Sequence, residues 1–219
     1  MNTEWSDLNK KMQLQIKKKG TFYEGIDTLL ELRKELMKEI LSFKELLNRE
    51  DFNAMPFINS KGYHNKTIVY SLYHIFRIED IVSNSLIKKR EQVFFKDNYH
   101  EKMKSPIITT GNELIKQEIS VFSAKLNLDE LYNYIKAVDV LTTQLLKELS
   151  YEDLKIKMTE RDKEMVKSLK VVSEADNAFW LIDYWCDKNI QGLIQMPLSR
   201  HWIMHIEASL RIKNKIYKC

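Results

Sequence analysis

Apolar residues recur at every third or fourth position along most of this chain, the spacing that gives an α-helix one buried face. The longest such stretch covers residues 22–47, and its other face is charged. Similar patterns cover residues 66–87, 128–149 and 198–217. No segment alternates apolar and polar residues for long, and only five Gly and three Pro are available for turns. The sequence therefore predicts an all-α fold, a four-helix bundle with additional short helices.

All 219 residues are expected to form a single helical domain, 1–219. Residues 1–19 have the pattern of an N-terminal extension helix, and residues 21–217 that of the bundle core. The segments between the long helices are expected to be a loop over 48–65, a connector over 88–111, a short helix over 112–126 and a polar stretch over 155–170. An aromatic helical segment over 179–186 precedes the last helix.

Charge and cysteine content exclude several classes of protein. Thirty-five basic and 31 acidic residues leave a net charge of +4, too even a balance for a nucleic-acid-binding face. No uncharged apolar run approaches the ~20 residues of a membrane helix, and the N-terminus lacks the apolar region of a signal peptide. Cys186 and Cys219 form neither a CxxC motif nor a disulfide framework. We expect a soluble cytoplasmic protein with no nucleic-acid or membrane partner.

Three histidines are candidate metal ligands. His201 and His205 follow Pro197 at the expected start of the last helix, where proline is favoured. Residues four apart share one helix face, so these two imidazoles can converge on one ion. His74 lies midway along the second long helix, on a seam of apolar and small residues. If the two helices are neighbours, three imidazoles would surround a metal and leave one position open, as in catalytic sites.

A packing role competes with metal binding for these residues. A single inward-facing histidine is most often a hydrogen-bonded core residue, although burying two imidazoles costs free energy unless both find partners. Spacing alone does not decide between the two roles. The pair also lacks the glutamate of His-Glu-x-x-His, which excludes that metalloprotease motif. His64 and His100 fall in predicted loops and are expected to be exposed, with His64 the next candidate ligand.

Residues around the histidine pair are candidates for substrate contacts. The aromatic side chains just before the last helix are either core or the wall of a pocket: Phe179, Trp180, Tyr184 and Trp185. Three charged residues are candidates for binding substrate or supporting the ligands: Asp183, Arg200 and Glu207.

Three motifs together resemble a known family. They are the lone histidine in Ser71-Leu72-Tyr73-His74-Ile75, the His201/His205 pair opening the last helix, and Leu128-Asp129-Glu130-Leu131 leading a helix that ends in Leu149-Ser150-Tyr151-Glu152-Asp153-Leu154. In these motifs the chain resembles the DinB/YfiT-like superfamily of bacterial four-helix proteins, over residues 21–217. The resemblance implies a divalent metal ion, zinc or nickel, held by His74, His201 and His205.

The resemblance also implies two alternative functions. The first is a metal-dependent enzyme, a thiol transferase or hydrolase of an unknown small molecule, whose partner would be a low-molecular-weight thiol such as bacillithiol or mycothiol. The metal would generate the nucleophile by lowering the pKa of a thiol or water. The second is a non-catalytic metal-binding or stress-associated interaction protein. An open site beside a pocket would favour the enzyme. A homodimer is the default expectation for a bundle with spare apolar faces.

Overall fold

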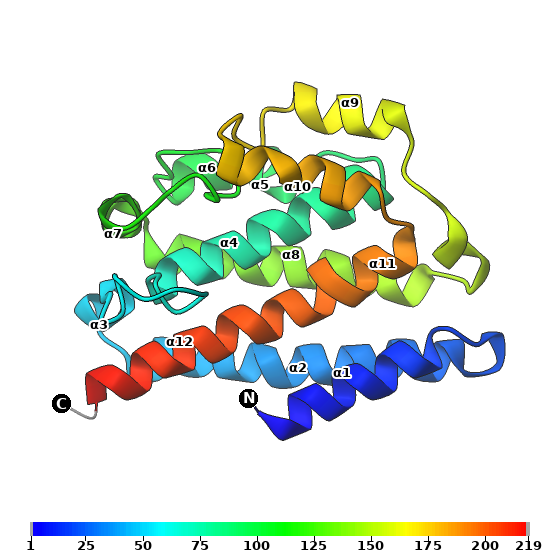
Figure 1. Ribbon diagram of the computed structural model, residues 1–219, viewed down its shortest axis with the longest axis horizontal. Coiled ribbons are helices and arrows are strands. Elements are labelled where there is room, and N and C mark those ends of the chain that lie inside the picture. The colour runs from blue at the N-terminus through cyan, green and yellow to red at the C-terminus, as the bar shows by residue number, and fades with distance from the viewer. Residues whose placement is uncertain (1, 218–219) are drawn as a thin grey trace.

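The computed structural model describes residues 2–217, and the regular structure in that range is helical (Figure 1). The helices are α1 (Thr3–Gln15), α2 (Phe22–Leu46), α3 (Arg49–Asn53), α4 (Ile68–Asp80), α5 (Val93–Lys96), α6 (Tyr99–Lys102), α7 (Gln117–Lys125), α8 (Leu128–Glu148), α9 (Glu160–Ser168), α10 (Asp176–Cys186), α11 (Ile190–Gln195) and α12 (His201–Tyr217). Between residues 2 and 217 there is no strand beyond an isolated β-bridge of Lys157 with Asn189. The predicted all-α class is confirmed.

Four long helices, α2, α4, α8 and α12, surround the main core (Figure 1). α2 packs against α8 and α12, and α4 packs against the same two helices from the other side. All 13 residues of α4 are buried, as expected for a helix that is apolar over a broad arc. A π-helical turn, Ile81–Ile87, extends α4 to the end of the predicted helix. None of the helices within residues 2–217 is both long and apolar enough to cross a membrane.

The last helix begins earlier than predicted. It starts at Ile190, where the side chain of Asn189 accepts a hydrogen bond from the Gly192 amide, and continues through a π-helical turn, Met196–Arg200, into α12. Pro197 therefore lies inside a helical stretch and not at its start. Proline lacks an N–H and crowds the preceding turn, and a widened turn relieves that crowding. The Ser199 hydroxyl donates to the Ile194 carbonyl at 2.8 Å, which pairs a carbonyl near the end of α11.

Segments expected to be polar or irregular contain short helices. α9 lies in the 155–170 stretch and begins with a capping box in which Thr159 and Asp162 each accept from the other's amide. Only Val166 of this helix is fully buried, so its apolar periodicity is weak in the sequence. α3 lies in the predicted 48–65 loop, α5 and α6 lie in the 88–111 connector, and the helix expected over 112–126 is only α7. Cys186 is a free thiol, and Cys219 lies outside the described residues.

A buried ion-pair cluster joins all four long helices. Arg33 of α2 donates to both Glu79 carboxylate oxygens in α4, at 2.7 and 2.9 Å, and to Asp139 in α8 at 2.7 Å. Glu79 also accepts from the indole N–H of Trp202 in α12, at 2.7 Å. The Arg33 guanidinium lies over the Trp202 ring and donates to the Leu198 carbonyl. These bonds fix the rotation of α12, so that Trp202 faces the core and its neighbour His201 faces α4.

Candidate metal centre

The packing of α12 on α4 brings the three predicted ligands together. One nitrogen from each of His74, His201 and His205 lies within 4.8 Å of the other two. The ring centroids are 4.6–5.0 Å apart, and each ring is steeply inclined to the others. All three side chains are buried. His74 thus joins a histidine pair that lies at least 127 positions further along the chain, and the three imidazoles form one cluster that could hold a metal ion.

The orientation of His74 is set by a backbone carbonyl. Its Nδ1 lies 2.8 Å from the Thr110 oxygen. A carbonyl only accepts hydrogen bonds, so Nδ1 carries the proton and Nε2 keeps a free lone pair. Histidines that bind metals in proteins commonly donate their other N–H in this way, which fixes the ring and increases its basicity. The Tyr70 ring stacks nearly parallel to the imidazole, at an interplanar angle of 10°.

The loop that carries Thr110 is held by α4 itself. Side chains of α4 donate to the neighbouring carbonyls: Tyr73 to Ile107 and Thr109, Arg77 to Ile108, and Tyr70 to Gly111. Gly111 has a φ of 80°, a conformation that favours glycine, and a Cβ there would lie 3.1 Å from the Tyr70 ring. These contacts leave no signal in the sequence, because Tyr70, Tyr73 and Arg77 have the pattern of ordinary core positions.

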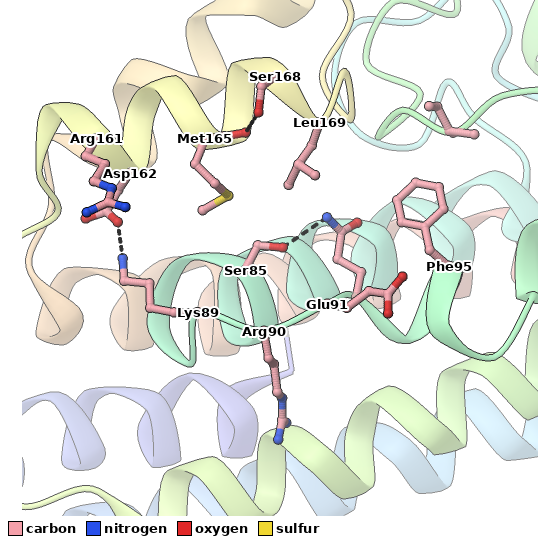
Figure 2. A pocket seen from close by; sticks show the side chains of 12 residues that line it. Ser85, Lys89, Arg90, Glu91, Phe95, Arg161, Asp162, Met165, Ser168 and Leu169 are labelled. Carbon is pink, nitrogen blue, oxygen red and sulfur yellow. Dashed lines mark hydrogen bonds and ion pairs between the residues drawn. The ribbon is translucent and has the colours of Figure 1, made fainter.

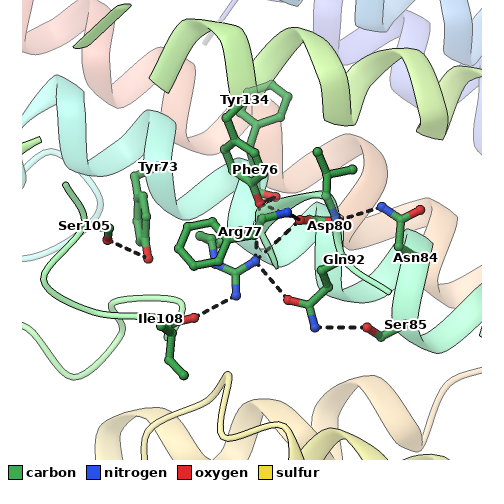
Figure 3. Close-up of polar contacts among 12 residues, drawn as sticks. Tyr73, Phe76, Arg77, Asp80, Asn84, Ser85, Gln92, Ser105, Ile108 and Tyr134 are labelled. Carbon is green, nitrogen blue, oxygen red and sulfur yellow. Dashed lines mark hydrogen bonds and ion pairs between the residues drawn. The ribbon is translucent and has the colours of Figure 1, made fainter. Parts of the chain in front are cut away.

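Arg77 connects this loop to a wider polar network (Figure 3). Besides the Ile108 carbonyl, its guanidinium contacts the Gln92 amide oxygen at 3.0 Å and the Tyr134 hydroxyl at 3.3 Å. The buried Asp80 carboxylate accepts from Tyr134 and Asn84, and from the backbone amides that open α5. The network therefore holds both the start of α5 and the loop that carries Thr110 against α4.

The two histidines of α12 lack the partners that a packing role requires. Nδ1 of His201 and both ring nitrogens of His205 are buried without a hydrogen-bond partner in the described part of the chain. An unpaired buried polar atom costs about 1–3 kcal/mol. A metal ion would use such lone pairs, so the donor set fits a metal better than it fits a packed core.

Burial keeps these imidazoles neutral. It lowers the pKa of His74 to about 4, against a smaller opposing effect of the Thr110 hydrogen bond. Burial, and then the neighbouring histidines, hold the pKa of His201 and His205 well below the usual value. Neutral imidazole is the form that coordinates metals, so at pH 7 the cluster is ready to bind without first releasing protons.

A cavity of about 290 Å³ opens beside the histidines. Its wall is largely aromatic, with Trp180, Tyr184 and Trp185 from α10 and Tyr63 from the loop before α4. The Tyr63 ring meets the His205 ring edge-on, with centroids 5.0 Å apart. The sequence leaves these aromatic residues between a core role and a pocket-wall role: Trp180 and Tyr184 line the cavity, and Trp185 lines it while being buried in the core. Phe179 lines a different hollow, near Lys167.

The other two histidines within residues 2–217 lie away from the cluster. His64 is half-buried and packs edge-on against Phe57, so it is not one of the converging ligands. His100 lies in α6 and not in a loop, and its ring packs near Phe94 and Phe95. Both were expected to be exposed, and both are partly buried because each ring packs against phenylalanine side chains.

The three charged candidates do not contact the histidine cluster. Asp183 pairs with Lys163 of α9 at 2.5 Å, and Glu207 accepts from the backbone amide of Asn2 at 2.6 Å. Arg200 is exposed on the π-helical turn. None of the three belongs to the cavity wall.

A second and larger cavity, about 980 Å³, lies between the Ile81–Ile87 turn and α9 (Figure 2). On its floor the Gln92 amide donates to the Ser85 hydroxyl, and at one end Lys89 pairs with Asp162. The histidine cluster is not part of its wall. No sequence motif predicts this cavity, because it depends on the position of α9.

No known protein-family model matches the chain, and comparison with curated protein sequences finds no match.

Proposed function

We propose that His74, His201 and His205 bind one divalent metal ion, zinc or nickel, and that the protein is a metal-dependent enzyme acting on a small molecule. The observation that carries the proposal is the state of the ring nitrogens. His74 has a fixed tautomer with Nε2 free, and His201 and His205 present buried nitrogens without partners within residues 2–217. Zinc and nickel both accept imidazole ligands.

We further propose that α2, α4, α8 and α12 form a four-helix bundle of the DinB/YfiT-like type. The four helices contact one another in a ring, and the Arg33 cluster ties them together at one level. In such bundles, metal sites are built in the core by side chains from facing helices. The cluster formed by α4 and α12 fits that scheme.

The chemistry follows from three protein ligands and an adjacent cavity. A metal held by three imidazoles keeps a position for water or substrate, and it lowers the pKa of a water or thiol there. In this chain Thr110 orients His74, the aromatic wall limits water, and the cavity admits a small molecule. We propose transfer to a low-molecular-weight thiol, or hydrolysis, as the reaction class. The cavity favours an enzyme over a purely structural metal site, which would need no such opening.

Metal analysis of untagged protein tests the proposal. After exposure to zinc or nickel and removal of free metal, we expect one equivalent in the parent and none in His205→Ala, because two imidazoles make a weak site. His64→Ala is the matched control and should bind like the parent. A parent protein that stays metal-free under both conditions would overturn the metal site and with it the enzyme.

A further inference from the structure

We infer that the cavity beside the histidines selects an uncharged aromatic molecule. The inference rests on the proposed function for the role of the histidines, and it names the class of substrate. Of the described residues that line the cavity, none is Lys, Arg, Asp or Glu. Lys188, whose ammonium lies 3.9 Å from the Tyr184 ring centroid, is not part of the wall, and neither is Arg200. A carboxylate or phosphate entering this space would therefore lose water without gaining an ionic partner from the wall.

The aromatic wall presents carbon surface to the cavity. Trp180 is 50% exposed although it is one of the largest apolar side chains, and its indole N–H already donates to the Asn177 carbonyl at 3.0 Å. Its ring packs edge-on against Tyr184, with centroids 5.6 Å apart. A ligand ring stacked in this space would bury the exposed part of Trp180 and gain from the edge-to-face geometry that aromatic rings prefer.

The volume of the cavity and the hydrogen-bonding group in its wall narrow the class of ligand. The volume of about 290 Å³ is roughly twice the ~150 Å³ that accommodates benzene, so one ring and a short substituent fit. The Asn112 amide oxygen accepts from Thr110, which leaves its NH₂ group to donate to a neutral oxygen or sulfur. The wall therefore suits a single-ring compound whose reactive heteroatom points to the histidines. Thiols that carry several carboxylates do not match it.

The test compares two thiols that differ in charge, benzyl mercaptan and mercaptosuccinate. Each is titrated into metal-free protein, followed by ligand NMR line broadening, and into protein given one equivalent of cobalt(II), followed by visible absorption. We expect benzyl mercaptan to bind metal-free protein at least about tenfold more tightly than mercaptosuccinate does. The cobalt(II) titration reports whether the metal site forms, because the carboxylates of mercaptosuccinate would also chelate the ion. Trp180→Ala should lose about tenfold in its affinity for benzyl mercaptan. Phe179→Ala, the neighbouring aromatic with its side chain in a different hollow, should lose nothing.

The inference would be overturned if mercaptosuccinate bound metal-free protein as tightly as benzyl mercaptan or more tightly. It would also be overturned if Trp180→Ala and Phe179→Ala lost the same affinity for benzyl mercaptan. Failure of the proposed function is seen separately. If cobalt(II) produces no absorption band but benzyl mercaptan still binds metal-free protein in a Trp180-dependent manner, the metal site is wrong and the ligand class is supported.

Discussion

The carbonyl of Thr110 and the unpartnered nitrogens of His205 show how single residues define the cluster. The Thr110 bond leaves Nε2 of His74 free, and the neutral ring of His205 holds one N–H and one lone pair without a partner among the described residues. The unpartnered nitrogens lower the stability of the metal-free fold, and both features favour an occupied site. At this scale the cluster is therefore built at the expense of packing.

His205→Leu should separate metal binding from stability. Leucine has no lone pair, so the variant should bind no metal. In chelator we expect it to be about 1 kcal/mol more stable than the parent, since an apolar side chain replaces an unpaired buried imidazole. Urea unfolding measures the difference. A variant that is clearly less stable than the parent in chelator would show that the His205 ring makes stabilising contacts of its own.

Acid should destabilise the metal-free protein. The pKa of His74 is about 4 in the fold and about 6.5 in an unfolded chain. Between these values the unfolded state binds more protons, so the free energy of unfolding falls as the pH falls from about 6.5 to 4. His74 alone contributes about 3 kcal/mol to this loss. Urea titrations in chelator between pH 7.5 and 4.5 measure it, and a flat profile would contradict the burial of neutral imidazoles.

At the scale of elements, α4 acts as both the carrier and the support of the site. It bears His74, and its tyrosines and Arg77 hold the loop whose carbonyl orients that histidine. The orientation of α12 depends on other contacts, because the Met196–Arg200 turn and the Trp202 hydrogen bond to Glu79 set its rotation. The site therefore depends on two elements that are positioned by contacts outside it.

Tyr73→Phe should weaken metal binding without touching a ligand. The change removes the hydroxyl that donates to the Ile107 and Thr109 carbonyls, so the Thr110 carbonyl loses support. We expect about tenfold weaker zinc affinity, in the range of lost supporting contacts, and a stability loss of about 1 kcal/mol. Tyr132→Phe is the matched control, since its hydroxyl donates to the Ile40 carbonyl at 2.8 Å, far along the chain from the loop. Competition with a zinc indicator distinguishes the two variants, and equal affinities would contradict the supporting role.

Over the whole molecule, the Arg33 cluster links α2, α4, α8 and α12. Ion pairs join α2 to α4 and α8, and the Trp202 hydrogen bond to Glu79 adds α12. Arg33 and Glu79 are almost completely buried, whereas Asp139 is partly exposed. A buried pair of this kind gains little over a well-packed apolar pair, but removing one member leaves an uncompensated charge. Its effect is to select one arrangement of the four helices.

Single and double substitutions should show how strongly the stability contributions of Arg33 and Glu79 depend on each other. Arg33→Met is expected to cost about 3–5 kcal/mol in free energy of unfolding, because it leaves the buried Glu79 carboxylate without its ionic partner. Glu79→Leu should cost less, because Arg33 keeps its ion pair with Asp139. The double variant should cost clearly less than the sum of the two. Urea unfolding of all four proteins gives the coupling energy. Additive losses would show that the two side chains act independently.

Local periodicity predicts the long helices and the half of the site that lies on one helix. Helix geometry places apolar residues at intervals of three and four on the buried face. The sequence therefore predicts the central parts of α2, α4, α8 and α12, and it predicts that His201 and His205 share one face. Short polar helices such as α9 are not predicted, because capping by Thr159 and Asp162 carries little periodic signal. The last helix begins at Ile190 and not after Pro197, because Asn189 caps it and a π-helical turn accommodates the proline.

Packing between distant segments brings His74 to the His201/His205 pair and orients its ring. The bonds of His74 to Thr110 and of Arg33 to Glu79 span 36 and 46 residues, and each depends on how two separate segments pack. No spacing rule encodes such contacts, since they form only after the helices have docked. The aromatic cavity likewise arises where α10 lies over the histidines. Local periodicity specified the elements, and long-range packing created the site.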